Sequence, residues 1–409
     1  MNCRHCNSPL ELTLVDLGSA PPSNNYLSSA ALKGPELWFP LRVLVCRECW
    51  LVQTEDFARA DELFDADYAY FSGYSASWLA HSKRYVHAMT ERFALDSHSL
   101  VIEVAANDGY LLQYVKEGNI PCLGIEPTAS TAAAAREKGI DIVQEFFGVS
   151  LGERLAAEGR QADLTTANNV LAHVPDINDF SGGFARVLKP TGVATFEFPH
   201  LLNLLEQSQF DTIYHEHFSY LSLVAVQRVF AANGLTVFDV EEIPTHGGSL
   251  RVFAQRSDSG QRPVSERVEA LIQRELDAGL ATESGYAGFQ AKADRVKDDF
   301  VAFLIEAKRS GKRVAGYGAA AKGNTLINYA GVRPDLLPFV VDRNPAKQST
   351  FLPGSRIPVV AEDRLRQERP DYAVILPWNL SAEVIDQLSY IRQWGGRFVT
   401  AVPQLRVQD

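Results

Sequence analysis

Short apolar runs alternate with stretches of helical composition along much of the chain. Residues 100–105 form one such run and predict a buried strand, which ends in a polar loop at residues 106–110. A helical stretch follows, and the next apolar run, residues 122–125, leads into an alanine-rich helix at residues 131–138. Strands that alternate with helices in this way are typical of a doubly wound α/β domain. We predict such a domain from about residue 98 onward.

A second region with the same alternation lies near the end of the chain. Residues 263–309 are largely helical by composition and are expected to bridge two domains. Residues 313–325 read as a strand, a glycine turn and a helix, and further strands are predicted at residues 339–342, 372–379 and 396–400. The expected result is a small parallel sheet.

Size and charge narrow the classes of function. A chain of 409 residues predicts two or three domains of roughly 150 residues each. Apolar residues make up 46% and charged residues 22%, so neither a disordered nor a fibrous protein fits. The net charge of −11 argues against nonspecific nucleic-acid binding. No apolar run reaches the length of a membrane span, about 20 residues, and the first residues lack a hydrophobic signal core, so we expect a cytoplasmic protein.

Four of the five cysteines fall into two Cys-x-x-Cys pairs, Cys3 with Cys6 and Cys46 with Cys49. Two short loops that each present two thiolates close a tetrahedral site of the kind that structural zinc prefers. Four thiolates leave no coordination position open for water, so we predict a structural Zn²⁺ rather than a catalytic one. The alternative is a set of redox-active or idle cysteine pairs. Cys122 stands alone in an apolar run and is expected to be an ordinary buried residue.

The loop after the first predicted strand indicates which nucleotide ligand the central domain binds. Glu126, at the end of the second predicted strand, is placed to accept both hydroxyls of a ribose, as in dinucleotide enzymes and methyltransferases alike. A dinucleotide also needs Gly-x-Gly-x-x-Gly, so that a helix N-terminus can approach its diphosphate. This loop holds one glycine, Gly109, after an amide and an acid. That composition favours S-adenosylmethionine, which has no phosphate, and leaves NAD as the main alternative.

The glycine turn near the end of the chain matches a dinucleotide pattern better. Gly316 and Gly318 are followed by Gly323, and Asp342 ends the next predicted strand. A phosphate at the helix N-terminus is physically reasonable there. Because the sequence carries no other sign of redox chemistry, we favour a duplicated Rossmann-like unit that helps to hold a substrate. A purely structural cap and an NAD site are the alternatives.

Residues 210–218 are unusually rich in titratable groups for a segment with apolar neighbours. His215 and His217 lie two apart with Glu216 between them. The arrangement suits acid–base chemistry, since histidine titrates near neutrality and exchanges protons when a carboxylate orients it. A metal-binding histidine pair, a solvated loop and a histidine satisfied within the core are the alternatives.

Several motifs resemble those of class I methyltransferases. Glu103 with Asn107-Asp108-Gly109 looks like the E-x-x-x-N-D-G variant of their first motif, and the stretch from Asn168 and Asn169 to Pro175 looks like the loop after their fourth strand. The resemblance implies a fourth strand at residues 163–164, a fifth at 192–198 and an antiparallel end hairpin from 235–240 and 250–254. It also implies that Glu103, Asn107, Asp108, Gly109, Glu126, Asn168 and Asn169 bind S-adenosylmethionine.

Together with the cysteine pairs and the run Tyr214-His215-Glu216-His217, these motifs resemble the nucleotide-sugar C-methyltransferases of deoxysugar biosynthesis. The tetronitrose-pathway C-3′-methyltransferase typifies this family. The resemblance covers nearly the whole chain and implies an α/β protein of three parts. These are a zinc-binding module at 1–65, a class I methyltransferase domain at 66–260, and a helical bridge with a Rossmann-like domain at 261–409.

Five residues correspond to catalytic positions of that family: Tyr70, His173, Tyr214, Glu216 and His217. The family carries an acid where this chain has His215, a departure that bears on substrate detail more than on reaction type. For the neighbouring Tyr68, packing within an aromatic-rich segment is the favoured interpretation. Residues 64–78 are expected to form a lid over a sugar nucleotide.

The chemistry that the resemblance implies begins at a ketone. A sugar carbon becomes a nucleophile when a neighbouring C4 ketone acidifies its C–H bond. We expect His217 to remove that proton, with Glu216 orienting His217 or stabilising its imidazolium. Tyr214, Tyr70 and His173 are expected to donate hydrogen bonds to the enolate oxygen. His215 is a rival base. The expected substrate is a nucleotide-linked 4-keto-deoxysugar, methylated at C3 or, as the alternative, at C5.

The remaining candidates line the expected cleft between the domains. Lys322 and the backbone near Gly318 are expected to face the diphosphate of the substrate, and His246 to line the cleft, although its glycine neighbours equally suit an ordinary hairpin turn. Three alternatives stay open at this stage. They are an NAD-dependent oxidoreductase, a sugar O-methyltransferase and a non-catalytic protein that binds S-adenosylmethionine.

Overall fold

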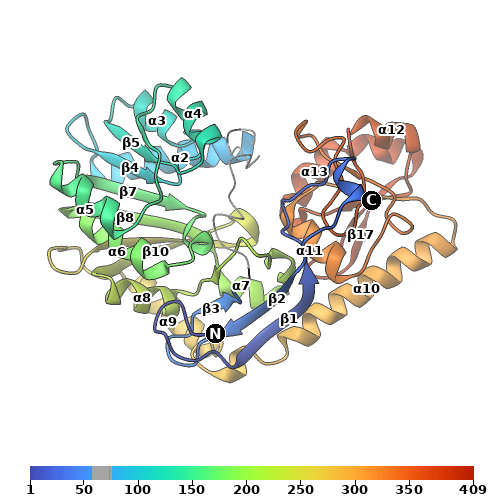
Figure 1. Cartoon of the computed structure of the whole chain (residues 1–409), viewed down its shortest axis with the longest axis horizontal. Helices are drawn as coiled ribbons and strands as arrows, with labels where there is room; N and C mark the ends of the chain where they lie inside the picture. Colours follow the sequence, from blue (N-terminus) through green and yellow to red (C-terminus); the bar gives the residue numbers. More distant parts are fainter. Residues whose placement is uncertain (58–72, 74–75) are drawn as a thin grey trace.

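The computed structural model describes residues 1–57, 73 and 76–409. Within that part of the chain the strands form three sheets, and Figure 1 shows two lobes with a strand hairpin reaching from one to the other. The N-terminal sheet is antiparallel, in the order β1 (Leu12–Ala20), β2 (Phe39–Val45), β3 (Val52–Thr54) and β9 (Ser219–Tyr220).

The central sheet has the strand order β10-β11-β8-β7-β4-β5-β6. It is parallel apart from β11, which runs antiparallel to both neighbours. This confirms the methyltransferase-type fold and its end hairpin. The strands are β4 (Val101–Val104), β5 (Cys122–Ile125), β6 (Ile142–Val143), β7 (Ala162–Asn168), β8 (Leu188–Pro199), β10 (Leu235–Ile243) and β11 (Ser249–Arg256).

Helices cover both faces of the central sheet, so apolar residues of its strands are buried on both faces. Successive residues of β4 show this, because Ile102 packs into the core on one face and Val101 into the core on the other. The helices are α2 (Ala76–Phe93), α3 (Leu112–Glu117), α4 (Ala129–Glu137), α5 (Val149–Ala157), α6 (Ile177–Val187) and α8 (Leu223–Ala232).

The segment after β8 leaves the central sheet and joins the N-terminal one. It forms α7 (Leu201–Glu206) and a short 3-10 helix, Phe210–Thr212, and then pairs as β9 with β3. Thr54 strengthens this junction, since its hydroxyl donates to the carbonyl of His217 at 3.0 Å and its N–H to that of Phe218 at 3.2 Å. The histidine-rich run therefore lies where the two sheets meet.

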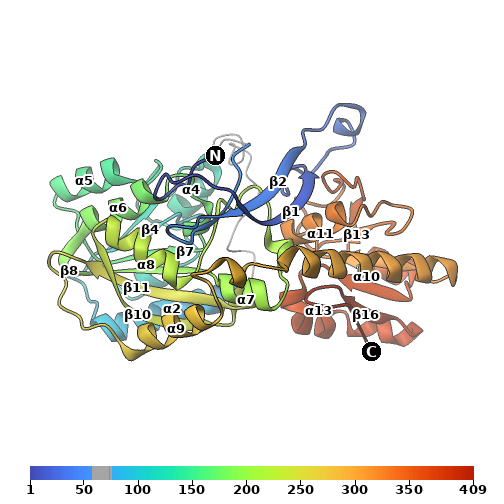
Figure 2. The ribbon, with the colours of Figure 1, turned by 90° about the horizontal axis from the view of Figure 1, so that it is seen from below.

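The last part of the chain begins with α9 (Glu266–Asp277) and α10 (Phe289–Arg309), the long helix that crosses the front of the final lobe in Figure 2. The predicted helical bridge is thus broken, and Gly279 and Gly288 take positive φ angles of 84° and 78° at the break. The final sheet has the order β14-β13-β12-β15-β16-β17. It is parallel as predicted except for β17, which is antiparallel to β16.

The elements of this final lobe are β12 (Val314–Tyr317), α11 (Ala321–Tyr329), β13 (Val340–Val341), β14 (Val359–Val360), α12 (Asp363–Glu368), β15 (Tyr372–Ile375), α13 (Ser381–Gln387), β16 (Arg397–Thr400) and β17 (Arg406–Gln408). No helix in the described ranges is long and apolar enough to cross a membrane.

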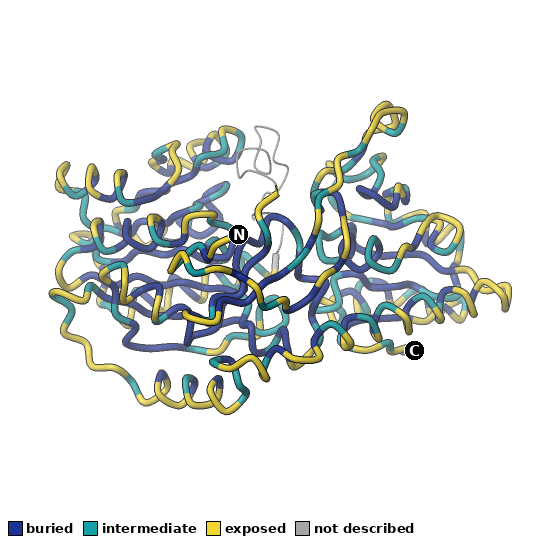
Figure 3. Tube along the Cα trace, turned by 60° about the horizontal axis from the view of Figure 1, so that its bottom comes forward, coloured by how far each residue is buried: buried dark blue, intermediate teal, exposed yellow. Residues whose placement is uncertain are grey.

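The N-terminal sheet shares cores with both lobes. Cys46 and Leu51 pack into the core of the central domain, whereas Leu14 and Val43 pack with Phe300 of α10 and with the final lobe. Figure 3 shows the resulting buried path through the middle of the molecule. The N-terminal module is therefore wedged between the two lobes, and its loops reach the space between them.

Candidate active site

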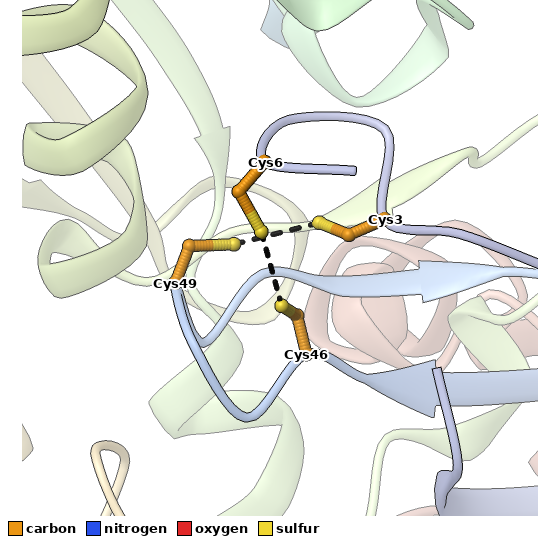
Figure 4. Close-up of side chains that lie close together, drawn as sticks. All are labelled: Cys3, Cys6, Cys46 and Cys49. Atoms are coloured by element: carbon orange, nitrogen blue, oxygen red, sulfur yellow. Dashed lines mark hydrogen bonds between the residues drawn. The ribbon is translucent and has the colours of Figure 1, made fainter. Parts of the chain in front are cut away.

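The two cysteine pairs converge as the sequence predicts. Their four sulfur atoms lie within 4.8 Å of one another, with Cys3 3.5 Å from Cys49 and Cys6 3.4 Å from Cys46 (Figure 4). Each pair occupies a tight turn that is closed by a backbone hydrogen bond, from Asn7 to Cys3 and from Trp50 to Cys46. Four convergent thiols fit a structural zinc ion, which would tie the first turn of the chain to the end of β2.

A cavity of about 690 Å³ opens between the lobes. One end is formed by the loops after β4, β5 and β7, and the other by the first turn of α11. In an open α/β sheet the carboxyl ends of the strands are the usual place for a ligand. This volume falls within the range of about 300–1,000 Å³ that small-molecule sites occupy.

The end near the central sheet is polar and tightly ordered. Glu126, at the end of β5, accepts the backbone N–H of Asn107 at 2.9 Å and that of Thr128 at 2.9 Å. Ala105 and Asn107 both have positive φ angles, which turn the loop after β4 toward the cavity. The carboxylate keeps further lone pairs for the hydroxyls of a ribose. Asn107 and Glu126 thus lie together on the cavity wall.

Asn168 and Asn169 complete this end from β7. Asn169 has a φ of 56° and its side-chain amide lies 3.3 Å from His246, which also lines the cavity. Within the described part of the chain, the Nδ2 of Asn168 and the Oδ1 of Asn169 are buried without a hydrogen-bond partner. Unpaired buried polar atoms are costly unless a ligand satisfies them, so this wall fits a polar cofactor such as S-adenosylmethionine.

Three of the predicted cofactor residues lie outside the cavity wall. Glu103 is buried in β4, and desolvation raises its pKa well above the ordinary value. Asp108 pairs with Lys138 at 3.1 Å. Gly109 has a φ of 74°, and a Cβ there would collide with Ile140. In this structure these three residues shape and support the loop after β4. Among the predicted cofactor residues of this loop, Asn107 is the one that lines the cavity.

His217 has a defined orientation in the middle of the cavity wall. Its Nδ1 lies 2.8 Å from the carbonyl of Thr212, and its Nε2 lies 2.8 Å from the hydroxyl of Tyr214. A carbonyl only accepts, so Nδ1 carries the proton, Nε2 is the basic nitrogen and Tyr214 donates to it. The ring of His173 meets the His217 ring edge-on, with centroids 4.6 Å apart.

Burial keeps both histidines neutral. It lowers the pKa of His217 well below the ordinary value, and the proximity of His173 adds to this effect. Burial also lowers the pKa of His173, to about 4, although a hydrogen bond with the backbone of Glu216 partly opposes this shift. Across neutral pH, Nε2 of His217 is therefore unprotonated and available as a base.

Glu216 lines the same cavity, but contrary to the expectation from the sequence it does not orient His217. Its Oε2 accepts a hydrogen bond from Asn24 of the β1–β2 loop at 2.6 Å, and the orienting contact of His217 comes from Thr212 instead. Desolvation raises the pKa of Glu216 to about 7. His215 points to the N-terminal sheet, where its Nε2 lies 3.1 Å from the carbonyl of Pro40, and it is not part of the cavity wall.

The far end of the cavity is cationic. Lys322, in the first turn of α11, donates to Asn379 at 2.9 Å, and Lys347 donates to the carbonyl of Ala319 at 2.8 Å. Burial lowers the pKa of both lysines. Gly318 lies behind this wall with a φ of 85°, and a Cβ there would collide with Pro377.

Sequence reasoning missed Asn24 and Lys347, which line the cavity. Trp78, which also lines it, is the last residue of the lid expected at residues 64–78. Lys347 follows Asp342 and the carboxyl end of β13. Because ligands bind at the carboxyl ends of parallel strands, the sequence could have indicated its position. Asn24 lies in a loop with no periodic pattern. Tyr68 and Tyr70 lie outside the described residues.

Comparison with known proteins agrees with these observations. Family models match residues 3–64 ("Putative zinc binding domain"), 78–240 ("Methyltransferase domain") and 244–403 ("C-methyltransferase C-terminal domain"). C-methyltransferase NovU of Streptomyces niveus is 34% identical over 405 residues, which cover 99% of this chain and 96% of NovU.

Two solved structures show looser likeness. Magnesium protoporphyrin IX methyltransferase from Synechocystis PCC 6803 with bound SAH is 14% identical, with a TM-score of 0.35 over 44% of this chain and 83% of that one. A protein from Pyrococcus horikoshii OT3 is 14% identical, with a TM-score of 0.38 over 49% of this chain and 100% of that one. The full-length match to NovU decides the family: the chain belongs to the C-methyltransferases, with S-adenosylmethionine as methyl donor and a zinc-binding N-terminal domain.

Proposed function

We propose that this C-methyltransferase acts on a nucleotide-linked 4-keto-deoxysugar, at C3 or, as the alternative, at C5. The observation that carries the proposal is the position of His217. Its basic Nε2 belongs to a cavity wall with Glu126 at the cofactor end and two half-buried lysines at the other. A base between a methyl donor and an anion site suits an anionic substrate with an acidic C–H bond.

Carbon methylation needs a carbanion equivalent, and His217 is the residue that generates it. The C–H bond beside the ketone breaks, its proton goes to Nε2, and its electron pair moves into the enolate. S-adenosylmethionine supplies an electrophilic methyl group, which the enolate carbon takes as the S–CH₃ bond breaks. Nδ1 keeps its hydrogen bond to Thr212, which holds the ring in place as the imidazolium forms.

The enolate oxygen needs hydrogen-bond donors, and Tyr214 and His173 are proposed to supply them, the neutral His173 with the proton that it now shares with the backbone of Glu216. Tyr214 now donates to Nε2 of His217, so its hydroxyl must turn to the substrate when that nitrogen takes the proton. Both side chains belong to the cavity wall. Such donors act where charge develops in the transition state and lower its free energy by about 3–4 kcal/mol each. Tyr70 is proposed as a third donor.

Lys322 and Lys347 are proposed to hold the diphosphate of the substrate. They lie beside Ala320 and Ala321 at the N-terminus of α11, where backbone N–H groups also favour an anion. A diphosphate would restore the full positive charge that burial disfavours in both lysines. The comparisons describe methyltransferases and so give no support to the NAD-dependent alternative.

The test is to incubate the protein with S-adenosylmethionine and a panel of nucleotide 4-ketosugars and to locate any new methyl group by NMR. In deuterated water the proton beside the ketone should exchange, and His217→Asn should abolish this exchange. A methyl group found on oxygen, or on carbon with His217→Asn exchanging as fast as the wild type, would contradict the proposal.

A further inference from the structure

The loop between β1 and β2 brings a residue of the N-terminal module into the active site. Asn24 lines the cavity, and its Nδ2 donates to Oε2 of Glu216 at 2.6 Å. This contact joins residues 192 positions apart. In Figure 2 the hairpin of β1 and β2 reaches across to the final lobe, beside α11 and β13.

The backbone on both sides of Asn24 is fixed to the final lobe. The Nδ2 of Asn324 in α11 donates to the carbonyl of Ser23 at 2.6 Å, and the hydroxyl of Tyr26 donates to the carbonyl of Ala319. Leu27 and Phe351 exchange two backbone hydrogen bonds of 2.9 Å each. With its neighbours held this way, the Asn24 amide has little freedom to move away from Glu216.

Two further groups interact electrostatically with the Glu216 carboxyl, and two histidines lie on the same cavity wall. Against the larger effect of burial, the positive charge of Lys347 lowers the pKa of Glu216. The charge of Glu216 in turn adds to burial in raising the pKa of Tyr26 in the β1–β2 loop. His173 hydrogen-bonds to the backbone of Glu216, and the neighbouring His217 lines the same wall. Asp342 in turn faces Lys347 and offsets part of its charge. Among the described residues, Asn24 is the one whose side chain hydrogen-bonds to the carboxylate, at 2.6 Å.

We propose that Asn24 is a positioning residue that holds the Glu216 carboxyl in the cavity in its ionised form, so that the N-terminal module takes part in catalysis. The inference rests on the proposed function. Ionised Glu216 would offset the positive charge that His217 gains with the substrate proton. An amide N–H can donate to the carboxylate, and a donor to the charged form favours that form.

The hydrogen bond from Asn24 determines in which direction the pKa of Glu216 changes when Asn24 is replaced. Burial already raises the pKa of Glu216 to about 7, and the Asn24 donor opposes the rise. Without the donor the pKa rises further, and less of the carboxyl is ionised at neutral pH. Activity that needs the carboxylate should then decline at neutral pH and return at alkaline pH. A residue with only a structural role would lower activity by the same factor at every pH.

The experiment compares Asn24→Ala and Asn24→Asp with the control Asn25→Ala, which alters the exposed neighbour. The acidic limb of kcat/KM should move up by about one pH unit in Asn24→Ala, a loss of about fivefold at pH 7 that recovers within about twofold at pH 9, and should move further in Asn24→Asp, because a second carboxylate repels the charge on Glu216. Asn24→Asp keeps the shape of the side chain and guards against misfolding. Limbs that coincide with that of Asn25→Ala, or a loss that is equal at all pH values, would overturn the inference.

A second readout separates this inference from the proposed substrate. The Glu216 carboxyl of the full-length protein is titrated by ¹³C NMR, with Glu216→Gln to assign its signal. Asn24→Ala should raise the titration midpoint by about one unit, and Asn25→Ala should leave it unchanged. If the wild type methylates no 4-ketosugar but the midpoint moves, the substrate proposal fails and the contact stands. An unmoved midpoint rejects the role of Asn24.

Discussion

Tyr214 donates its hydroxyl proton to Nε2 of His217 across 2.8 Å, while the other ring nitrogen holds the carbonyl of Thr212. The pair fixes both the tautomer and the direction of the basic lone pair before any ligand binds. The Thr212 contact can hold the ring through the reaction, whereas the Tyr214 hydroxyl must turn away before Nε2 takes the substrate proton.

Replacing His217 should therefore remove the base but leave cofactor binding intact. We expect His217→Asn to lower kcat by about 10²–10⁴-fold, the usual contribution of positioned acid–base catalysis. Calorimetric affinity for S-adenosylmethionine should change little. His215→Asn is the matched control, because His215 faces Pro40 outside the cavity, and it should retain most of the activity. The reverse order of effects would identify His215 as the base.

The pH dependence should report Glu216 rather than His217. Because the pKa of Glu216 is raised to about 7, the carboxylate is present above that pH and is lost as the pH falls through it. The pKa of His217 lies well below its ordinary value, so His217 adds no limb near neutrality. We expect kcat/KM to rise with pH through about 7 and then level off, and Glu216→Gln to lower activity and flatten this limb. A limb that persists in Glu216→Gln would assign it to another group.

Removal of zinc should destabilise the whole protein rather than its first residues alone. Cys46 and Cys49 pack in the same core as the central domain. We expect Cys46→Ser, or extraction with a strong chelator, to lower the free energy of unfolding by more than about 4 kcal/mol, as loss of a structural metal does. Metal analysis should give one zinc per chain. Cys122→Ser serves as the control and should keep its zinc.

Loss of Lys322 should selectively weaken the binding of the nucleotide sugar. A charge-assisted hydrogen bond contributes about 1.5–3 kcal/mol, so Lys322→Met should raise KM for the sugar nucleotide by roughly 10- to 100-fold. The affinity for S-adenosylmethionine should stay the same, because its proposed site lies at the other end of the cavity. Lys308→Met, at an exposed salt bridge, is the control. Equal weakening of both ligands would place Lys322 in a general structural role.

The parts of this site that sequence could predict are those that local chemistry dictates. Each Cys-x-x-Cys turn brings two thiols together, and the preference of structural zinc for four ligands predicts that two such turns meet. Apolar runs predict most strands of the two Rossmann-like units. Glu126 could be predicted because the end of the second strand always faces the ligand edge.

Contacts that join distant segments could not be predicted in this way. Asn24 meets Glu216 only because the N-terminal sheet wedges between the lobes, and nothing in the pattern around residue 24 indicates that packing. The partner of Glu216 could not be predicted for the same reason, because Asn24 is distant in the sequence. Its neighbour His217 takes its orientation from the Thr212 carbonyl and not from Glu216. The glycines that break the helical bridge were visible in the sequence, but their positive φ angles were not.

The pairing of β3 with β9 has a practical bearing on engineered hybrids. The run that carries Tyr214, Glu216 and His217 leads directly into β9, and Thr54 at the end of β3 binds the carbonyl of His217. An excised methyltransferase domain would leave that run with a free edge, and a chimera with a foreign amino-terminal module would have to rebuild the pairing. Substrate range in this enzyme should therefore be altered by exchanging strands β1 to β3 and the 200–222 segment as one cassette.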